Sequence, residues 1–198
     1  MAIPEHQRLL TEAIAREGDA HRLLLAGDGG AARMALIETA VLYRRSWEAS
    51  PPRAYGRLLG MLKAAVLAGE ATAPAAYARK AIGSQGDSPT SWYVLGLAAL
   101  IADDDALTIV AARGMREAAA GLSSGSEAFL RTAEALAALA YRNADRYAAA
   151  LREILDDFES RDEHLTGVAI ADTVLMLERL GADRGLAAGP ESPLLPRA

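Results

Sequence analysis

The chain has 198 residues, a net charge of −5 and no cysteine. This length suffices for one ordinary domain with a sizeable core. The lack of cysteine excludes disulfides, thiolate nucleophiles and cysteine-based zinc sites, and it suits a reducing compartment. Alanine is abundant and only 5% of the residues are aromatic. Because alanine favours helices and strand-forming residues are scarce, the composition predicts an all-α protein.

Hydropathy and charge bear on location and partners. No stretch approaches the roughly 20 apolar residues that a membrane span needs, and no signal peptide is expected at the start, so we expect a cytoplasmic protein without membrane contact. The preference for arginine over lysine is typical of a GC-rich, bacterial genome.

Charge is distributed unevenly along the chain. Residues 1–80 carry 11 basic and 8 acidic side chains, whereas residues 81–198 carry 10 basic and 18 acidic side chains. This asymmetry predicts that any homo-oligomer is held together partly by electrostatic attraction.

Gly, Pro, Ser and Asp clusters divide the chain into eight or nine helices in one domain, residues 1–185. The expected antiparallel hairpins and final helix cover residues 4–49, 53–82, 88–120, 125–159 and 165–180. Ser88 is expected to cap a helix that has Pro89 in its first turn. Ser124 and Glu127 have the spacing of a capping box. No segment alternates apolar and polar residues over the length of a strand.

A repeat of 37 residues relates Tyr55, Trp92 and Phe129, each near the start of an expected helix. A period of this length with a helix–turn–helix unit predicts an α-solenoid, a stack of helical hairpins. We expect the three aromatic side chains to be largely buried in equivalent places. Gly60 is expected to face a neighbouring helix closely.

The segment Trp92-Tyr93-Val94-Leu95-Gly96 has the pattern W-x-x-L-G, and Gly27-Asp28 with Ala32 resembles the turn of the same motif. Arg146 to Leu151 resembles the start of its second helix. These segments resemble the tetratricopeptide (TPR) repeat. The resemblance implies a right-handed stack of hairpins whose odd-numbered helices line a concave, protein-binding face.

The sequence contains no known motif of a catalytic, phosphate-binding or metal-binding site. The three histidines, His6, His21 and His164, stand in no zinc-protease or di-iron pattern, and each is predicted to be a solvated surface residue. No phosphate-binding loop or nucleophile elbow occurs. We therefore expect no catalytic, cofactor or metal site. Asp172 is different, because it interrupts the apolar segment 168–177 and is expected to be buried and hydrogen-bonded.

Basic and aromatic residues gather where the second expected helix meets the third, and they form the candidate partner-binding surface. Its members are Arg44, Arg45, Trp47, Arg53, Tyr55 and Arg57, with Trp92 added from the repeat. We also expect Lys63 to belong to this basic surface. The acidic balance of the chain disfavours nucleic acid, so an acidic peptide or a second copy is the expected partner.

The C-terminal segment, residues 186–198, is rich in proline and predicted to be extended. We expect it to dock on its own domain or a neighbour's groove through Leu194 and Leu195.

Taken together, these features predict a non-catalytic protein- or peptide-binding module. Two alternatives remain open. One is the small-molecule or effector-binding domain of a regulator, with a pocket between helices near Trp92. The other is an enzyme with an unfamiliar helical site.

Overall fold

The computed structural model describes residues 3–196. Residues 1–2 of the predicted domain and 197–198 of the predicted tail lie outside this range. Within it the chain forms nine α-helices and no strand, which confirms the all-α prediction. The helices are α1 (Glu5–Leu25), α2 (Gly29–Glu48), α3 (Gly56–Ala68), α4 (Thr72–Ile82), α5 (Pro89–Ile101), α6 (Asp105–Ala119), α7 (Ser126–Ala140), α8 (Ala144–Glu159) and α9 (Asp172–Asp183).

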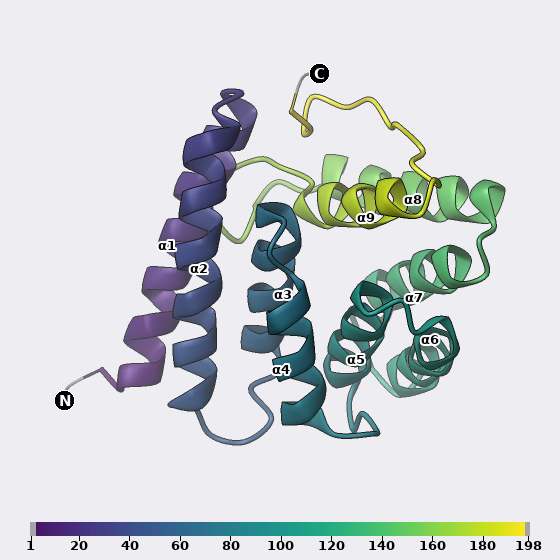
Figure 1. Ribbon diagram of the computed structural model, residues 1–198, viewed down its shortest axis with the longest axis horizontal. Helices are drawn as coiled ribbons and strands as arrows, with labels where there is room; N and C mark the ends of the chain where they lie inside the picture. Colours follow the sequence, from purple (N-terminus) through teal and green to yellow (C-terminus); the bar gives the residue numbers. More distant parts are fainter. Residues whose placement is uncertain (1–2, 197–198) are drawn as a thin grey trace.

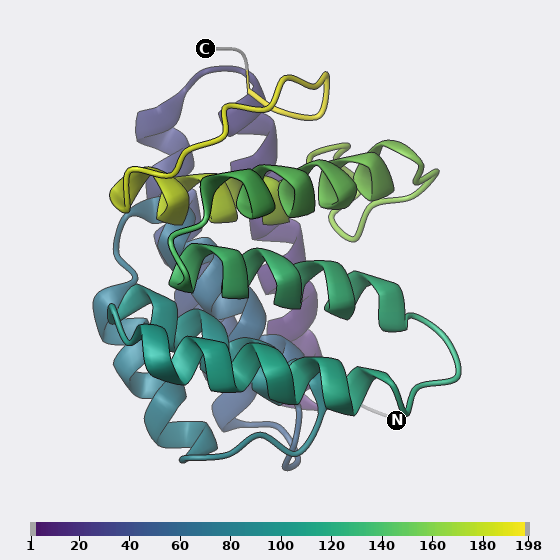
Figure 2. The same cartoon turned by 90° about the vertical axis from the view of Figure 1, so that its right-hand side faces the viewer.

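Successive helices pack against one another, and the last helix returns to the first half of the chain. The long helices α1 and α2 lie side by side, and α3 packs on α2 (Figure 1). Helices α6, α7 and α8 are stacked one above another (Figure 2). Helix α9 packs on both α8 and α3, so it joins the two halves of the array. None of the helices between residues 3 and 196 is long and apolar enough to cross a membrane.

Two predicted helix starts are wrong and one is confirmed. The final helix begins at Asp172 instead of residue 165, because residues 161–171 form an irregular segment with a left-handed glycine, Gly167 (φ 69°). Helix α7 begins at Ser126 after Gly125, which is also left-handed (φ 72°) and occupies the capping position expected of Ser124. Ser88 does cap α5, where its side chain accepts a hydrogen bond from the backbone N–H of Ser91.

Three aromatic rings lie directly on glycines of neighbouring helices. A Cβ atom built on Gly60 of α3 would lie 2.7 Å from the ring of Tyr43, and one built on Gly114 of α6 would lie 2.5 Å from Trp92. The third ring, that of Tyr147, lies somewhat less closely against Gly181 of α9, where a Cβ atom would lie 3.0 Å from its hydroxyl oxygen and 3.2 Å from its ring carbons. The lack of a side chain at these glycines lets the helices approach, as predicted for Gly60.

The three period-related aromatics occupy less buried places than expected. Tyr55, Trp92 and Phe129 are each half-buried and pack against the edge of the main hydrophobic core. The centre of the core consists instead of leucine and alanine side chains with the fully buried Tyr147. All three aromatics of the repeat therefore lie at the border of the core and not at its centre.

The C-terminal tail is docked on its own domain, as predicted. Leu195 is buried, and Leu194 packs beside it against the main core. The carbonyl oxygen of Leu194 accepts a hydrogen bond of 3.0 Å from the backbone N–H of Ala171. The tail thus supports the residue that immediately precedes α9.

Replacing Gly60 by alanine should lower the free energy of unfolding by about 1–3 kcal/mol, because the new methyl group overlaps the Tyr43 ring. This loss should outweigh the higher helix propensity of alanine. Gly56 is the matched control on the same helix, because a Cβ there meets nothing within 4 Å. Urea denaturation should find Gly56→Ala at least as stable as the wild type. A Gly60→Ala protein more stable than the wild type would contradict the packing described here.

Candidate functional site

The predicted partner-binding residues on α2 and the start of α3 are brought together, but most of their polar groups already have partners. Arg44 forms an ion pair of 2.9 Å with Glu48, and its guanidinium lies 4.1 Å from the centre of the Tyr77 ring. The rings of Trp47 and Tyr55 stack at 5.7 Å.

The remaining members of that predicted surface differ in accessibility. Arg45 is exposed, and Arg53 is paired with Asp87 at 3.0 Å. The Nε of Arg57 donates a hydrogen bond of 2.8 Å to the hydroxyl of Ser46. Trp92 lies apart on α5, where its ring covers Gly114. Trp92 is therefore a packing residue between α5 and α6.

Two sequence-based assignments are wrong in this region. His21 is 2% exposed instead of lying on the surface, because its side chain occupies the same buried stripe of α1 as Leu9 and Ala13. Lys63 belongs to no surface basic cluster. Its side chain is 16% exposed and its ammonium forms an ion pair with Asp172, which is equally buried. As predicted, Asp172 is hydrogen-bonded, and its side chain is largely withdrawn from water, with 16% of it exposed.

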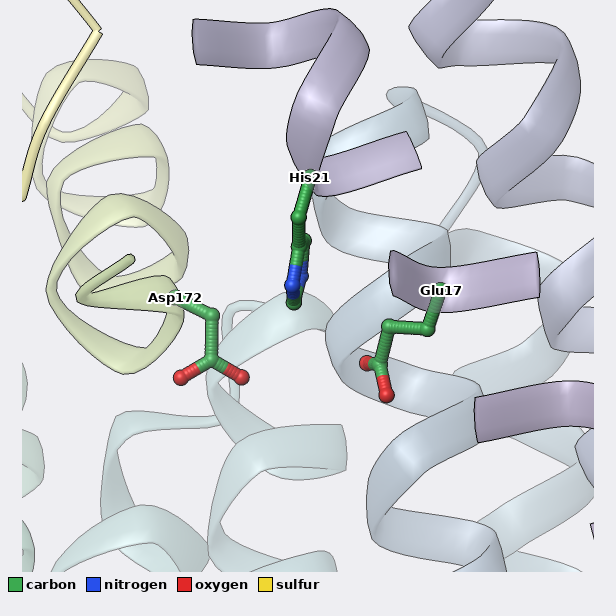
Figure 3. Close-up of side chains that lie close together, drawn as sticks. All are labelled: Glu17, His21 and Asp172. Carbon is green, nitrogen blue, oxygen red and sulfur yellow. The ribbon is translucent and has the colours of Figure 1, made fainter. Parts of the chain in front are cut away.

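Together with Glu17, the three residues just described form a group that we call the buried ionic cluster. Its members are Glu17, His21, Lys63 and Asp172. Helix α1 supplies Glu17 and His21 one turn apart, α3 supplies Lys63, and the first residue of α9 is Asp172. The imidazole of His21 lies between the two carboxylates (Figure 3). The donor atoms of Glu17, His21 and Asp172 all lie within 4.8 Å of one another.

A shell of hydrogen bonds orients the members of the cluster. The hydroxyl of Tyr43 donates to Glu17 Oε2 at 2.8 Å. The backbone N–H of Thr173 donates to Asp172 Oδ1 at 2.7 Å. His21 Nδ1 lies 3.1 Å from Thr166 Oγ1 in the segment before α9.

One nitrogen of the cluster is left without a partner. His21 Nε2 is buried and has no hydrogen-bond partner among the described residues. Buried polar atoms of this kind are uncommon, because an unpaired donor or acceptor loses its bonds to water and gains none in return. The free nitrogen therefore marks a place where a bound group would be stabilised.

Burial and charge change the protonation of the cluster. Burial raises the pKa of Glu17 to about 7 and lowers the pKa of His21 to about 4, since both environments disfavour the charged form. Burial opposes ionisation of Lys63 and Asp172 as well, but their mutual attraction prevails, so the pKa of Lys63 is raised and that of Asp172 is lowered. At neutral pH the cluster thus holds one firm ion pair beside a neutral imidazole.

Two adjoining cavities open beside the cluster. The first has a volume of about 190 Å³ and is lined by Glu17, His21, Lys63 and Asp172 together with residues 164–166. The second has a volume of about 180 Å³ and is bordered by apolar side chains of Leu59, Phe129 and Ile154. Both cavities are lined by Lys63, Phe158, Arg161 and Thr173, which therefore form their common wall.

The common wall carries a layered aromatic and cationic group. The guanidinium of Arg161 lies 3.9 Å from the centre of the Phe158 ring, and the His164 ring stacks on Phe158 at 6.3 Å. The two cavities thus combine ionisable groups, aromatic faces and aliphatic surface in one place.

The sequence held a signal for this site that pattern searches for metal-binding motifs do not detect. Glu17 and His21 are four residues apart and stand in line with Leu9 and Ala13 on the apolar face of α1. Ionisable residues at core-facing positions are rarely buried without a partner. The partner, Asp172, is distant in sequence, so only the fold reveals the site.

Comparison with protein-family models, curated proteins and solved structures found no match for this chain.

The two shifted pKa values predict opposing effects of pH on stability. Because the pKa of Glu17 is raised from 4.5 to about 7, its stabilising contribution is present below pH 4.5 and lost as the pH rises towards 7. Because the pKa of His21 is lowered from 6.5 to about 4, its contribution is present above pH 6.5 and lost as the pH falls towards 4. Between pH 4.5 and 6.5 the two effects largely cancel in the wild type.

Glu17→Gln should remove this cancellation. Relative to the wild type, its free energy of unfolding should gain about 2–3 kcal/mol between pH 4.5 and 6.5, because only His21 still titrates in this range. Urea denaturation at both pH values, with EDTA present, measures the difference. Glu12→Gln, an exposed change on the same helix, should follow the wild type. Equal pH dependence in all three proteins would contradict the burial of Glu17.

Proposed function

We propose that the protein is a helical binding domain for a small amphipathic molecule, which occupies the two adjoining cavities. The observation that carries this proposal is the unpartnered, buried Nε2 of His21, a residue that lines a polar cavity sharing a wall with a largely apolar one. Small-molecule sites typically combine apolar lining with a few polar groups that fix the orientation of the ligand. A polar head beside the cluster and an apolar body near Phe129 and Ile154 would match this combination.

The position of the cavities also supports a small ligand over a long peptide. The second cavity is lined by Leu59 of α3, Tyr93 of α5 and Phe129 of α7, three of the odd-numbered helices that would line the concave face of a TPR-like stack. Helix α9, which begins at Asp172, packs on α3 beside the first cavity, which Asp172 and Thr173 line. Trp92, which was expected near a pocket, lines neither cavity.

We further infer that the hairpins are TPR-like repeats. The 37-residue period supports this inference, as does the packing of Tyr55, Trp92 and Phe129 at the border of the core.

Protein or peptide binding is our second candidate function, and it concerns a different surface. The stacked Trp47 and Tyr55 lie close to exposed arginines, Arg44 and Arg45. Such a combination of aromatic and cationic groups suits an acidic peptide. In both candidate functions the protein binds another molecule, a small ligand or a peptide, and does not catalyse a reaction.

A tryptophan placed in the apolar cavity tests the first proposal. Ala128 is exposed on α7 and lines this cavity, so Ala128→Trp should fill it. The control is Ala106→Trp at an exposed position of α6 that lines neither cavity. The probes are anilinonaphthalene sulfonate and a panel of aromatic amines and carboxylic acids, followed by ligand-detected NMR and calorimetry.

We expect saturable binding of at least one probe, weakened about tenfold or more in Ala128→Trp and unchanged in Ala106→Trp. The proposal fails if the folded wild-type protein binds none of the probes. It also fails if both tryptophan variants bind as tightly as the wild type.

A further inference from the structure

Three potential metal ligands converge in the buried ionic cluster. Glu17 and His21 project from the same face of α1, and Asp172 approaches from the start of α9 (Figure 3). Their donor atoms lie within 4.8 Å of one another. Ligand atoms bound to one zinc ion, at about 2.0–2.2 Å from it, lie about 3–4 Å apart, so small side-chain rotations would bring the three into coordination distance.

The free nitrogen of His21 distinguishes this cluster from an ordinary group of acidic residues. His21 is 98% buried, since its exposed fraction is 2%, and its Nε2 has no partner within residues 3–196. The contact between Nδ1 and Thr166 Oγ1 orients the ring and leaves Nε2 as its free nitrogen. Metal-binding histidines are commonly oriented in this way through their second nitrogen.

The carboxylates are oriented as well. Tyr43 holds one oxygen of Glu17, and the backbone N–H of Thr173 holds one oxygen of Asp172. The other oxygen of Glu17 is left to bind an ion, whereas the other oxygen of Asp172, Oδ2, is paired with the ammonium of Lys63. Gly18 contributes to this arrangement, because a Cβ there would lie 3.0 Å from the carbonyl oxygen of Thr166. The segment that carries Thr166 can therefore pack directly on α1.

We propose that Glu17, His21 and Asp172 bind one divalent transition-metal ion, of the zinc, cobalt or manganese class. One imidazole nitrogen with two carboxylate oxygens is a donor set suited to these ions. The cavity of about 190 Å³ leaves room for further coordination positions. This inference rests on the proposed function, because those positions face the place where the polar head of the small molecule would lie.

Lys63 sets a condition on metal binding. Its ammonium is paired with Asp172 in the metal-free protein and supplies the positive charge that a metal ion would bring. A bound ion and the ammonium therefore compete for the same carboxylate. It follows that the metal must displace Lys63 from Asp172, and that removal of the ammonium strengthens metal binding.

The experiment uses the full chain, stripped with EDTA and dialysed. Calorimetric titration with Zn²⁺ and the visible absorption of added Co²⁺ report stoichiometry, affinity and geometry. We expect one ion per chain, and an affinity at least tenfold lower in His21→Ala and in Asp172→Asn. The matched control is His164→Ala, which removes the other histidine of the same cavity and should leave the affinity unchanged.

Lys63→Met gives an outcome that a merely structural ion pair would not give. It should bind Zn²⁺ several-fold more tightly than the wild type, and bound Zn²⁺ should restore any thermal stability that the variant has lost. Circular dichroism shows whether each variant is folded. If His21→Ala does not fold, the more conservative change Asp172→Asn takes its place in the test.

Three results would overturn the metal site. The first is that the wild type binds no Zn²⁺ at 100 µM, and the second is that His21→Ala and His164→Ala lose equal amounts of Zn²⁺ affinity. The third is that Lys63→Met binds Zn²⁺ more weakly than the wild type. The Ala128→Trp protein separates this inference from the proposed function. It should lose the small-molecule probe and keep the metal. Probe binding without metal binding would disprove the metal site alone, whereas metal binding without probe binding would disprove the small-molecule function alone.

Discussion

The ion pair between Lys63 and Asp172 is the interaction that closes the helical array. It joins the middle of α3 to the first residue of α9, and both side chains are largely withdrawn from water. Breaking such a pair by removing one partner is strongly unfavourable, because the other charge stays buried and uncompensated. The position of α9 is therefore tied to that of α3.

Contacts around α9 reinforce this constraint. The tail supports the backbone of Ala171, and the side chain of Arg184 at the other end of the helix donates hydrogen bonds to Asp103, Asp105 and the carbonyl oxygen of Leu100. The Arg184 side chain is only 4% exposed. Helix α9 is thus fixed at both ends by charge-assisted or backbone hydrogen bonds, which explains how a helix far along the chain comes to complete a site on α1 and α3.

Glycine–aromatic contacts connect the packing of the helices to the chemistry of the cluster. Tyr43 lies over Gly60 and at the same time donates its hydroxyl hydrogen to Glu17. Tyr147 does the same at the other end of the array, where it covers Gly181 and donates to Glu178. Each phenol ring fills the space above a glycine while its polar end reaches a carboxylate, so a shift of the helix would disturb both contacts.

The helices could be predicted from local signals, whereas the site could not. Ser88 with Pro89 begins α5 as expected, because capping depends on residues close together in sequence. Helix α9 begins later than predicted because residues distant in sequence hold the segment 161–171 in an irregular conformation. His21 contacts Thr166, and the tail accepts a hydrogen bond from Ala171, and no local pattern predicts such contacts. The apolar neighbours of Asp172 predict its burial correctly, but the sequence predicts a surface position for its partner Lys63, since a lysine in an amphipathic helix is normally solvated.

The burial of Glu17 and His21 explains why this place, and not the exposed basic surface, is the stronger functional candidate. On the surface, pairs such as Arg44 with Glu48 are satisfied in water and contribute little to stability. In the cluster, burial shifts both pKa values towards the neutral forms, which means that the fold opposes the charges these residues would carry in water. Apolar side chains of similar size would fill the same stripe of α1 without this penalty and without an unpaired nitrogen. Residues that break a local rule of folding without a compensating gain in stability are typical of functional sites, because binding requires groups that are not already satisfied.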